Sequence, residues 1–285
     1  MQFVKMHGLG NDFIIAREDQ PDLKPEHYAS LAVKLCDRNF GIGADGLVII
    51  GRDPHHDIFM RIFNPDGSEP EMCGNAIRCV ARYAWDVGLV FSPRISVRTL
   101  AGPRYPELIL EEGRVISVRV DMGEPILERS LIPMLGEPGP VIGEELTTPA
   151  GCFRITAVSM GNPHCVIFVD DFARVKLSEL GPVIESYPLF PSKTNVEFVK
   201  IESKERISMR VWERGAGETL ACGTGACASL VASFLNGFTD RQALVCLQGG
   251  ELFIEWSAAD NHVYMTGEAT LVFTGQISLD TLTNT

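Results

Sequence analysis

Hydrophobic and polar residues alternate along much of this chain, which is the pattern of strands that are buried on one face. The alternation is clear in four stretches, residues 94–100, 114–120, 206–212 and 251–256. A further stretch, Ala-Thr-Leu-Val-Phe-Thr, lies in the closing segment after Gly267. We expect the four stretches to form strands, and the closing segment to return and pair with the first part of the chain.

Helical spacing of hydrophobic residues is restricted to a few segments. Residues 25–39 present one apolar face and end before a glycine, and residues 177–186 form a weaker counterpart because a Gly-Pro pair interrupts them. Residues 76–85 and 226–235 also have helical character, and the second segment is apolar or small on every side. A helix without a polar face must be surrounded by protein, so we expect these last two helices to be buried.

The chain repeats one pattern at about half its length. The first copy spans residues 61–79 and the second spans residues 210–227, aligned on Cys73 and Cys222. In both copies an Arg lies twelve residues before the central cysteine, a Glu lies four residues before it and a Gly follows it directly. A Gly-Asn pair in each half repeats at nearly the same offset, which indicates a duplication.

Duplication predicts two pseudo-symmetric domains of the α+β class. Each is expected to be a curved, mixed or antiparallel sheet wrapped around one buried central helix with a cysteine at its start. We expect the N-terminal domain to comprise residues 1–121 plus 268–285 and to carry Cys73. The C-terminal domain is expected to comprise residues 122–267 and to carry Cys222, with the active site in the cleft between the two domains.

The chain is acidic, with 25 Lys and Arg against 37 Asp and Glu and a formal net charge of −12. Such a surface does not neutralise phosphates, which argues against nucleic acid as a partner. The N-terminus lacks a signal-peptide pattern, and no hydrophobic run approaches the length of a membrane helix. We therefore expect a soluble cytoplasmic protein that binds a small molecule and no membrane.

Eight cysteines are present, and in a chain of this size without a secretory signal we expect them to be reduced. Cys165 and Cys246 lie in apolar runs and are expected to be small core residues. Cys73 and Cys222 differ, because each precedes a glycine at the expected start of a helix. The next cysteines follow at spacings of six and five residues, which do not match zinc sites, so we expect no metal.

A thiol at a helix start meets unpaired backbone N–H groups and the positive end of the helix dipole. We expect such a thiol to ionise more easily than a free cysteine. Two opposed helix starts hold a carboxylate between them, with one sulfur on each face of its α-carbon. One thiolate then removes the α-proton while the opposite thiol returns a proton to the other face, which inverts the carbon.

Six segments carry a resemblance to a known family. They are Lys5–Phe13 (KMHGLGNDF), Arg61–Glu69 (RIFNPDGSE), Cys73–Cys79 (CGNAIRC), Ser159–Cys165 (SMGNPHC), Glu213–Thr219 (ERGAGET) and Ala221–Cys227 (ACGTGAC). Together they resemble diaminopimelate epimerase over essentially the whole chain. The resemblance implies interconversion of LL- and meso-diaminopimelate in lysine biosynthesis, without pyridoxal phosphate or another cofactor, and commonly a homodimer.

The resemblance also implies roles for individual residues. Cys73 and Cys222 are the expected acid/base groups, and His164 and Glu213 the expected assisting pair. The expected substrate-binding residues are Asn11, Gly46, Asn64, Gly74, Asn75, Asn162, Asn195, Glu213, Arg214, Gly223 and Thr224. Some family members carry Gln where this chain has Gly46, so that side-chain contact is missing here.

Other interpretations remain open from the residues alone. A proline or hydroxyproline racemase uses the same two-cysteine chemistry on a smaller substrate. A non-catalytic protein with a Cys73–Cys222 redox switch is the alternative from another class. Without the resemblance, Asn162 is equally well a turn residue, His164 an ordinary hydrogen-bonded histidine and Arg214 part of a surface pair.

Overall fold

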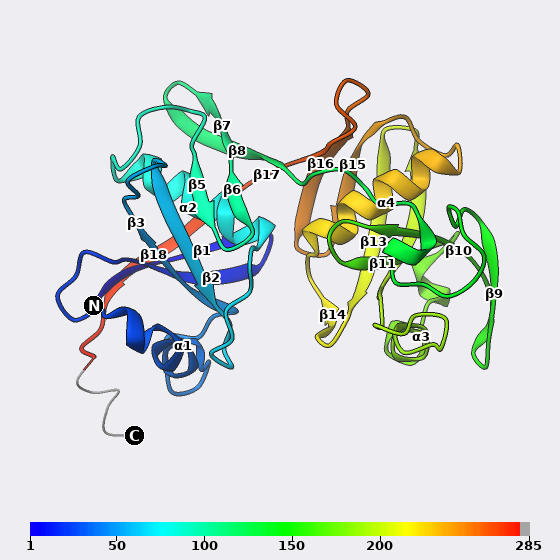
Figure 1. Ribbon diagram of the computed structural model, residues 1–285, viewed down its shortest axis with the longest axis horizontal. Coiled ribbons are helices and arrows are strands. Elements are labelled where there is room, and N and C mark those ends of the chain that lie inside the picture. The colour runs from blue at the N-terminus through cyan, green and yellow to red at the C-terminus, as the bar shows by residue number, and fades with distance from the viewer. Residues whose placement is uncertain (280–285) are drawn as a thin grey trace. The chain divides into compact units, whose positions relative to one another are not determined.

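The computed structural model describes residues 1–279. The chain forms two compact units: unit 1 comprises Met1–Val120 and the chain from Gly267 on, and unit 2 comprises Asp121–Thr266 (Figure 1). Of the expected return segment 268–285, residues 280–285 lie outside the described residues. Both units combine sheets with a few helices, which confirms the expected α+β class.

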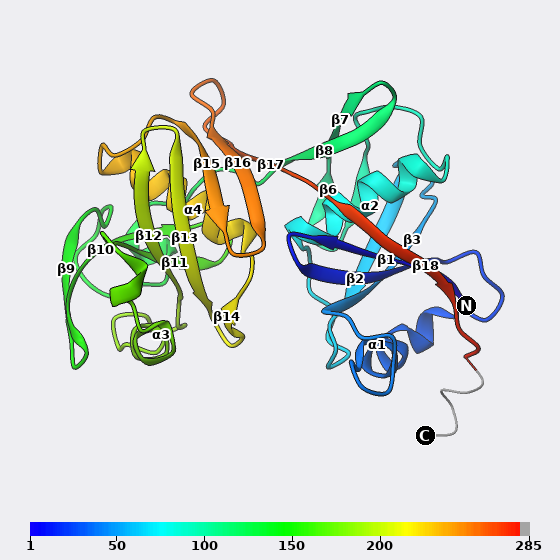
Figure 2. The same ribbon diagram turned by 180° about the vertical axis from the view of Figure 1, so that it is seen from behind.

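Unit 1 is built on one mixed sheet with the strand order β18-β1-β2-β3-β4-β5-β6. The strands are β1 (Gln2–Gly8), β2 (Asn11–Arg17), β3 (Gly46–Gly51), β4 (Ile58–Phe63), β5 (Val97–Thr99), β6 (Gly102–Arg104) and β18 (Thr270–Gln276). A hairpin of β7 (Glu107–Glu111) and β8 (Arg114–Asp121) follows β6 in the chain. As expected, the closing segment returns, and β18 pairs antiparallel with β1 (Figure 2).

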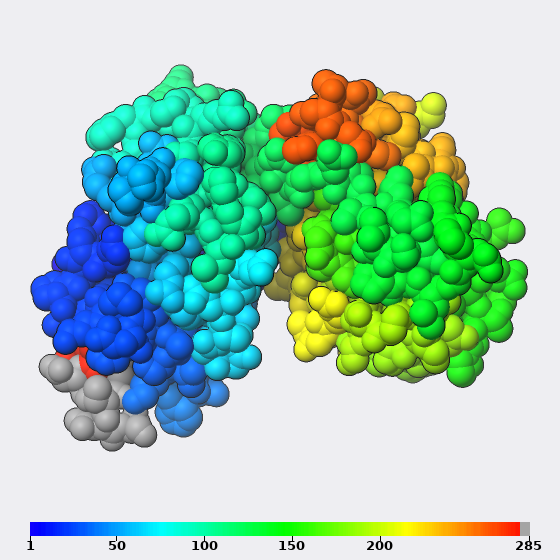
Figure 3. All heavy atoms as spheres, in the orientation of Figure 1, coloured from blue at the N-terminus to red at the C-terminus, as the bar shows by residue number. Residues whose placement is uncertain are grey.

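Unit 2 contains the strand order β17-β16-β15-β13-β12-β11-β10-β9, with β14 paired to β13. The strands are β9 (Glu144–Thr148), β10 (Gly151–Ser159), β11 (Pro163–Phe168), β12 (Asn195–Ser203), β13 (Arg206–Glu213), β14 (Gly217–Thr219), β15 (Gln242–Leu247), β16 (Gly250–Trp256) and β17 (Val263–Gly267). In the view of Figure 3, residues soon after Asp121, coloured green, form much of the surface of this unit.

The two units share one topology. In unit 1 the pairs β1–β2, β2–β3, β3–β4, β4–β5 and β5–β6 alternate between antiparallel and parallel. In unit 2 the pairs β10–β11, β11–β12, β12–β13, β13–β15 and β15–β16 alternate in the same order. The repeated sequence pattern is therefore a repeated fold.

Each unit has one helix inside its sheet and one outside. The inner helices are α2 (Gly74–Asp86) and α4 (Gly223–Leu235), and the outer ones are α1 (Tyr28–Cys36) and α3 (Leu177–Glu185). The helix α4 contacts six strands, β10 to β13, β15 and β16, while α2 contacts β1, β2, β4 and β7. Nine residues of α4 are buried, as its lack of a polar face requires.

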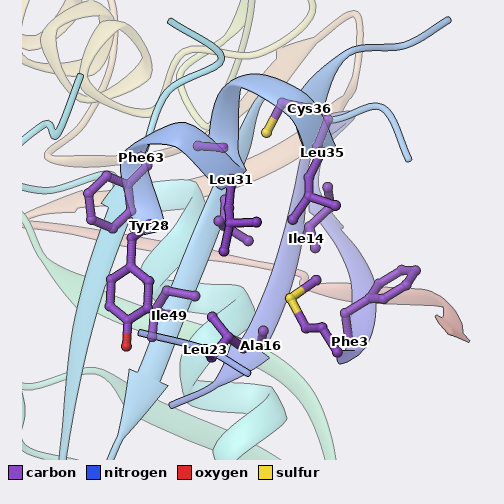
Figure 4. Packing of buried hydrophobic residues seen from close by; sticks show 14 of the residues in the cluster. Phe3, Ile14, Ala16, Leu23, Tyr28, Leu31, Leu35, Cys36, Ile49 and Phe63 are labelled. Atoms are coloured by element: carbon purple, nitrogen blue, oxygen red, sulfur yellow. The ribbon is translucent and has the colours of Figure 1, made fainter. Parts of the chain in front are cut away.

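The outer helix of unit 1 packs on the sheet through a hydrophobic cluster. Leu31 and Leu35 of α1 lie against Ile14 and Ile49 of the sheet (Figure 4). The ring of Tyr28 meets Phe63 edge to face at 5.8 Å between centroids. This packing holds α1 against one face of the sheet of unit 1.

Three local expectations need correction. The helix expected over 25–39 is a 3₁₀ turn, Pro25–His27, followed by α1, which ends at Cys36 because the Asp37 side chain accepts the next N–H groups instead. The strand expected over 94–100 is reduced to Val97–Thr99. Cys246 is partly exposed, because it lies in a sheet that is covered on one face only, whereas Cys165 is fully buried as expected.

No helix within residues 1–279 is both long and apolar enough to cross a membrane.

Candidate active site

Both central cysteines occupy the N-cap position of a 13-residue helix, Cys73 before α2 and Cys222 before α4. Their backbones are extended, with φ, ψ of −141°, 122° and −126°, 112°. In each case the first helical residue is a glycine. The two units therefore present a thiol at the same place in the same fold, beside the unpaired N–H groups of a helix start.

The Cys222 thiol is enclosed. Cys222 is 4% exposed, its Sγ accepts the backbone N–H of Gly225 at 3.4 Å, and the hydroxyl of Thr224 lies 3.5 Å from the sulfur. Burial raises the pKa of Cys222 well above its ordinary value, and the negative charges of Glu213 and Glu197 raise it further. The expectation of an easily ionised thiol is therefore wrong here, because desolvation and two carboxylates outweigh the helix start.

Cys73 is more open and lies beside an amide pair. Its Sγ is 3.8 Å from Oδ1 of Asn11, and the same oxygen accepts a hydrogen bond from Asn75 Nδ2 at 3.0 Å. The Asn11 Nδ2 donates to Oδ2 of Asp45 at 2.8 Å. The fold thus brings together three residues expected in the site, and Asp45 sets the direction of the Asn11 amide.

Asp45 belongs to a charged network at the start of β2. Arg38 Nη2 donates to both Asp45 and Asp12, and Lys5 forms an ion pair with Asp12 at 2.6 Å. Burial acts to raise the pKa of Asp12, but the hydrogen bonds from Arg38 and Lys5 prevail and lower it to about 2. Asp12 stays ionised, so the network remains intact around Asn11.

In unit 2, His164 joins two of its neighbours. Its Nε2 lies 3.0 Å from Oδ1 of Asn162, and its Nδ1 lies 2.6 Å from Oε1 of Glu197. His164 and Glu197 are both 0% exposed. Glu197 was not expected in the site. Its charge between two apolar residues of β12 is the feature of the sequence that could have indicated it.

The Asn195 amide ties two segments together. Its Nδ2 donates to the carbonyl of Pro163 at 2.8 Å, and its Oδ1 accepts the backbone N–H of Arg214 at 2.9 Å. Asn195 is 3% exposed and lies opposite His164 in the parallel β11–β12 register. Here Asn195 aligns the turn of Arg214 with the start of β11.

Glu213 ends β13 and accepts a hydrogen bond from the Thr219 hydroxyl. Arg214 follows it, and its guanidinium donates to the carbonyl of Ser192 at 3.1 Å. Glu213 acts electrostatically on Cys222 and on Glu197, so it belongs to the surroundings of the buried thiol. Arg214 is held on the surface of unit 2.

Two expected residues stand apart from these clusters. The Asn64 side chain donates to the hydroxyl of Ser68 within its own turn at 2.9 Å. Gly46 is buried in β3, and a Cβ there would lie 3.1 Å from the carbonyl of Phe63, so a larger residue needs a small shift of the strand.

The repeated Arg and Glu of the sequence form the same ion pair in both units. Arg61 binds Glu69 through two bonds of 2.7 and 2.8 Å, and Arg210 binds Glu218 at 2.7 Å. In each unit this pair joins a strand, β4 or β13, to the segment that leads into the cysteine. The conserved spacing within the chain therefore fixes the approach to each helix start.

A family model described as diaminopimelate epimerase matches residues 3–128 and 156–272. The chain belongs to the diaminopimelate epimerase family. It is 60% identical over 276 residues to the diaminopimelate epimerase of Pelotomaculum thermopropionicum, covering 97% of this chain and 98% of that one. The diaminopimelate epimerase of Methanococcus maripaludis is 52% identical, covering 98% and 100%. The expected family and the expected class, an isomerase, are confirmed.

Solved structures share the fold of this family member at low identity. A phenazine biosynthesis protein of the PhzF family from Bacillus anthracis matches with a TM-score of 0.70 and 16% identity, covering 97% of this chain and 99% of that chain. A hydroxyproline epimerase from Agrobacterium vitis matches with a TM-score of 0.66 and 17% identity, covering 98% and 93%. These likenesses establish the fold and no more.

Among the side chains of residues 1–279, no group of three or more His, Cys, Asp or Glu is placed to hold a metal ion.

Proposed function

We propose that this chain interconverts LL-2,6-diaminopimelate and meso-diaminopimelate as a step of lysine biosynthesis, without a cofactor. Membership of the diaminopimelate epimerase family and the names of relatives at 52–60% identity support the substrate. The observation that carries the proposal is the pair of thiols at equivalent helix N-caps, one in each unit.

The proposed chemistry uses Cys73 and Cys222 as two acid/base groups that act on opposite faces of one α-carbon. The thiolate of one forms an S–H bond with the α-hydrogen as the Cα–H bond breaks. The thiol of the other gives its proton to the opposite face, so that the carbon is inverted and the charges of the two sulfurs are exchanged. The reverse reaction exchanges their roles.

The carbanion formed in between spreads its charge onto the substrate carboxylate. We propose that the N–H groups of Gly74 and Asn75 in one unit, and of Gly223 and Thr224 in the other, bind that carboxylate. Donors fixed at helix starts favour an anion without reorganising when charge develops. His164 and Glu213 are the proposed assisting groups, and the remaining polar contacts are assigned to Asn11, Asn64, Asn162, Asn195 and Arg214.

We further propose that Cys222 rests as the thiol and acts first as the acid. Its enclosure and the neighbouring charge of Glu213 support this assignment, because both disfavour a negative charge on the sulfur. The reaction needs both sulfurs reduced, so we place the protein in the cytoplasm, where thiols persist. A homodimer is proposed as the assembled form.

The test is hydrogen exchange during turnover. LL-diaminopimelate incubated with the protein in D₂O is expected to gain deuterium at one α-carbon and to become the meso isomer with no added cofactor. Cys73→Ala and Cys222→Ala are each expected to abolish inversion. L-proline and trans-4-hydroxy-L-proline serve as the competing substrates. Inversion of these instead, or inversion of diaminopimelate by both single variants, contradicts the proposal.

A further inference from the structure

Glu197 is a carboxyl group buried in an apolar strand. It lies in β12 between Val196 and Phe198, it is 0% exposed, and its Oε1 lies 2.6 Å from Nδ1 of His164. Its Oε2 has no hydrogen-bond partner within residues 1–279. Burying a carboxylate with a single hydrogen-bond partner destabilises the folded state, so a role in the site would account for its presence here.

The two hydrogen-bond partners of the His164 ring determine which of its nitrogens carry hydrogen. Its Nε2 faces Oδ1 of Asn162 at 3.0 Å, and because an amide oxygen only accepts, Nε2 carries hydrogen. On the other side, Nδ1 faces Oε1 of Glu197, and one proton must lie between them. Either the carboxyl group donates to a neutral imidazole, or an imidazolium donates to a carboxylate. Both states have zero net charge.

The surroundings favour retention of that shared proton. Burial raises the pKa of Glu197, the positive form of His164 opposes this, and the charge of Glu213 on β13 raises it again. Loss of the proton would leave one uncompensated negative charge in a fully buried site near Cys222. Burial and the charge of Glu213 therefore both favour a proton shared between Glu197 and its partner.

Gly225 shows how close this pair lies to the buried thiol. A Cβ at Gly225 would lie 2.8 Å from Oε1 of Glu197 and 3.2 Å from Sγ of Cys222. Only glycine leaves room for both groups at the start of α4. The carboxyl group of Glu197 thus contacts the His164 ring and also lies next to the start of α4.

We propose that Glu197 is a positioning residue of this site, which holds the hydrogen of His164 on Nε2 and thereby turns the amide NH₂ of Asn162 toward the substrate carboxylate that the helix starts do not bind. Oδ1 of Asn162 accepts the hydrogen bond from His164. The Nδ2 of the same amide is therefore directed away from His164. Without a proton at the Nδ1 side from Glu197, the other imidazole tautomer forms and accepts at Nε2. The Asn162 amide then turns over and presents an oxygen, which repels a carboxylate. The link to substrate rests on the proposed function.

The first test is the ¹⁵N spectrum of the histidine rings, assigned with His164→Gln and read without substrate. The expected result is hydrogen on Nε2 of His164 in the natural protein and in Glu197→Gln, because the Gln amide NH₂ donates to Nδ1. Glu197→Met, which keeps the volume and removes the polar atoms, is expected to give the mixed tautomers of a free imidazole. An Nε2 without hydrogen in the natural protein overturns the proposal, whatever the substrate is.

The second test separates binding from structure. Glu197→Met is expected to raise KM for LL-diaminopimelate about 2- to 5-fold, in proportion to the fraction of molecules that hold the other tautomer, with a smaller change in kcat. Glu197→Gln is expected to keep the natural KM, because its amide NH₂ donates to Nδ1 and the hydrogen stays on Nε2. Ser233→Ala, which removes a buried hydroxyl of α4, is the control for packing. Equal losses in the Gln and Met variants would make Glu197 merely structural.

Absence of turnover by the natural protein would contradict the proposed function, while the ¹⁵N spectrum would still show which nitrogen of His164 carries hydrogen.

Discussion

The backbone N–H of Gly225 donates to Sγ of Cys222 at 3.4 Å. The thiol thereby takes the place of a capping hydroxyl at the start of α4, where a serine or an aspartate usually binds this N–H. The same bond marks the position of the sulfur in the helix start and restricts its movement. A side chain at Gly225 is therefore expected to disturb catalysis and stability together.

Gly225→Ala places a methyl group between two polar groups that cannot both move away. We expect it to destabilise the fold by about 1–3 kcal/mol, the usual cost of overpacking, and to reduce kcat strongly. Gly223→Ala is the comparison, because its nearest neighbour is the flexible Met265 side chain, with Sδ at 3.0 Å. Urea denaturation of both variants checks the difference, and equal stabilities would contradict it.

The eight cysteines are expected to react with iodoacetamide in an order set by exposure and pKa. Cys152 is exposed and Cys73 is partly exposed, whereas Cys222 is buried and its pKa is raised by burial and by neighbouring carboxylates. Because the thiolate is the nucleophile, Cys222 is expected to react last of these three. Peptide mass mapping after short exposures measures the order. Modification of Cys222 ahead of Cys73 would show that its thiol is ionised at rest.

The repeat was readable from the sequence because it rests on local spacing. The Arg and Glu at fixed distances before each cysteine have one role in both units, and the glycine after each cysteine opens each helix. The α+β class followed from alternating stretches and two helices that had to be buried. These features depend on neighbours in the chain, which a pattern records.

Residues that act through space were harder to predict. Glu197 meets His164 from another strand, and Asp45 meets Asn11 from a loop 34 residues further along. The pKa of Cys222 was expected in the wrong direction because its burial and its two carboxylate neighbours come from tertiary packing. A helix start was visible in the sequence, whereas desolvation was not.

Alkaline pH is expected to destabilise the protein through its buried thiols. Burial raises the pKa of Cys79 to about 12. Above pH 9 the unfolded thiol loses its proton while the folded one keeps it, so stability falls as pH rises until the folded pKa is reached. The slope is about 1.4 kcal/mol per pH unit for each such thiol.

Cys79→Ala isolates this effect, since Lys and Tyr contributions cancel between the two proteins. Urea denaturation at pH 8 and at pH 9.5–11 is expected to show a shallower loss of stability for the variant, by about the slope of one thiol. Cys152→Ala, at an exposed site, is the control and should follow the natural protein. Identical slopes in all three would contradict the expected shift.

The Arg61–Glu69 ion pair is expected to contribute modestly and to share its energy with stacking. The guanidinium also lies over the rings of Phe63 and Tyr28, at 5.0 and 5.4 Å from their centroids. Glu69→Gln is therefore expected to cost less than Arg61→Met, with a coupling of about 0.5–1 kcal/mol in a double-mutant cycle. A coupling of zero would leave the pair without a stabilising role.

The proposed homodimer is expected to assemble through β18. In the described part of the chain the sheet of unit 1 ends at this strand, and Leu271, Val272 and Phe273 on it are 43%, 53% and 45% exposed. An edge strand with exposed apolar side chains favours pairing, and a two-fold axis lets the same strand of a second copy pair with it antiparallel.

Phe273→Asp is expected to give a monomer by sedimentation equilibrium where the natural protein is a dimer, because pairing would bury the charge of the new Asp. Leu220→Asp, at an exposed apolar residue of unit 2, is the control and should remain dimeric. A dimer that survives Phe273→Asp would place the interface elsewhere, and a natural protein that is monomeric at micromolar concentration would contradict the homodimer itself.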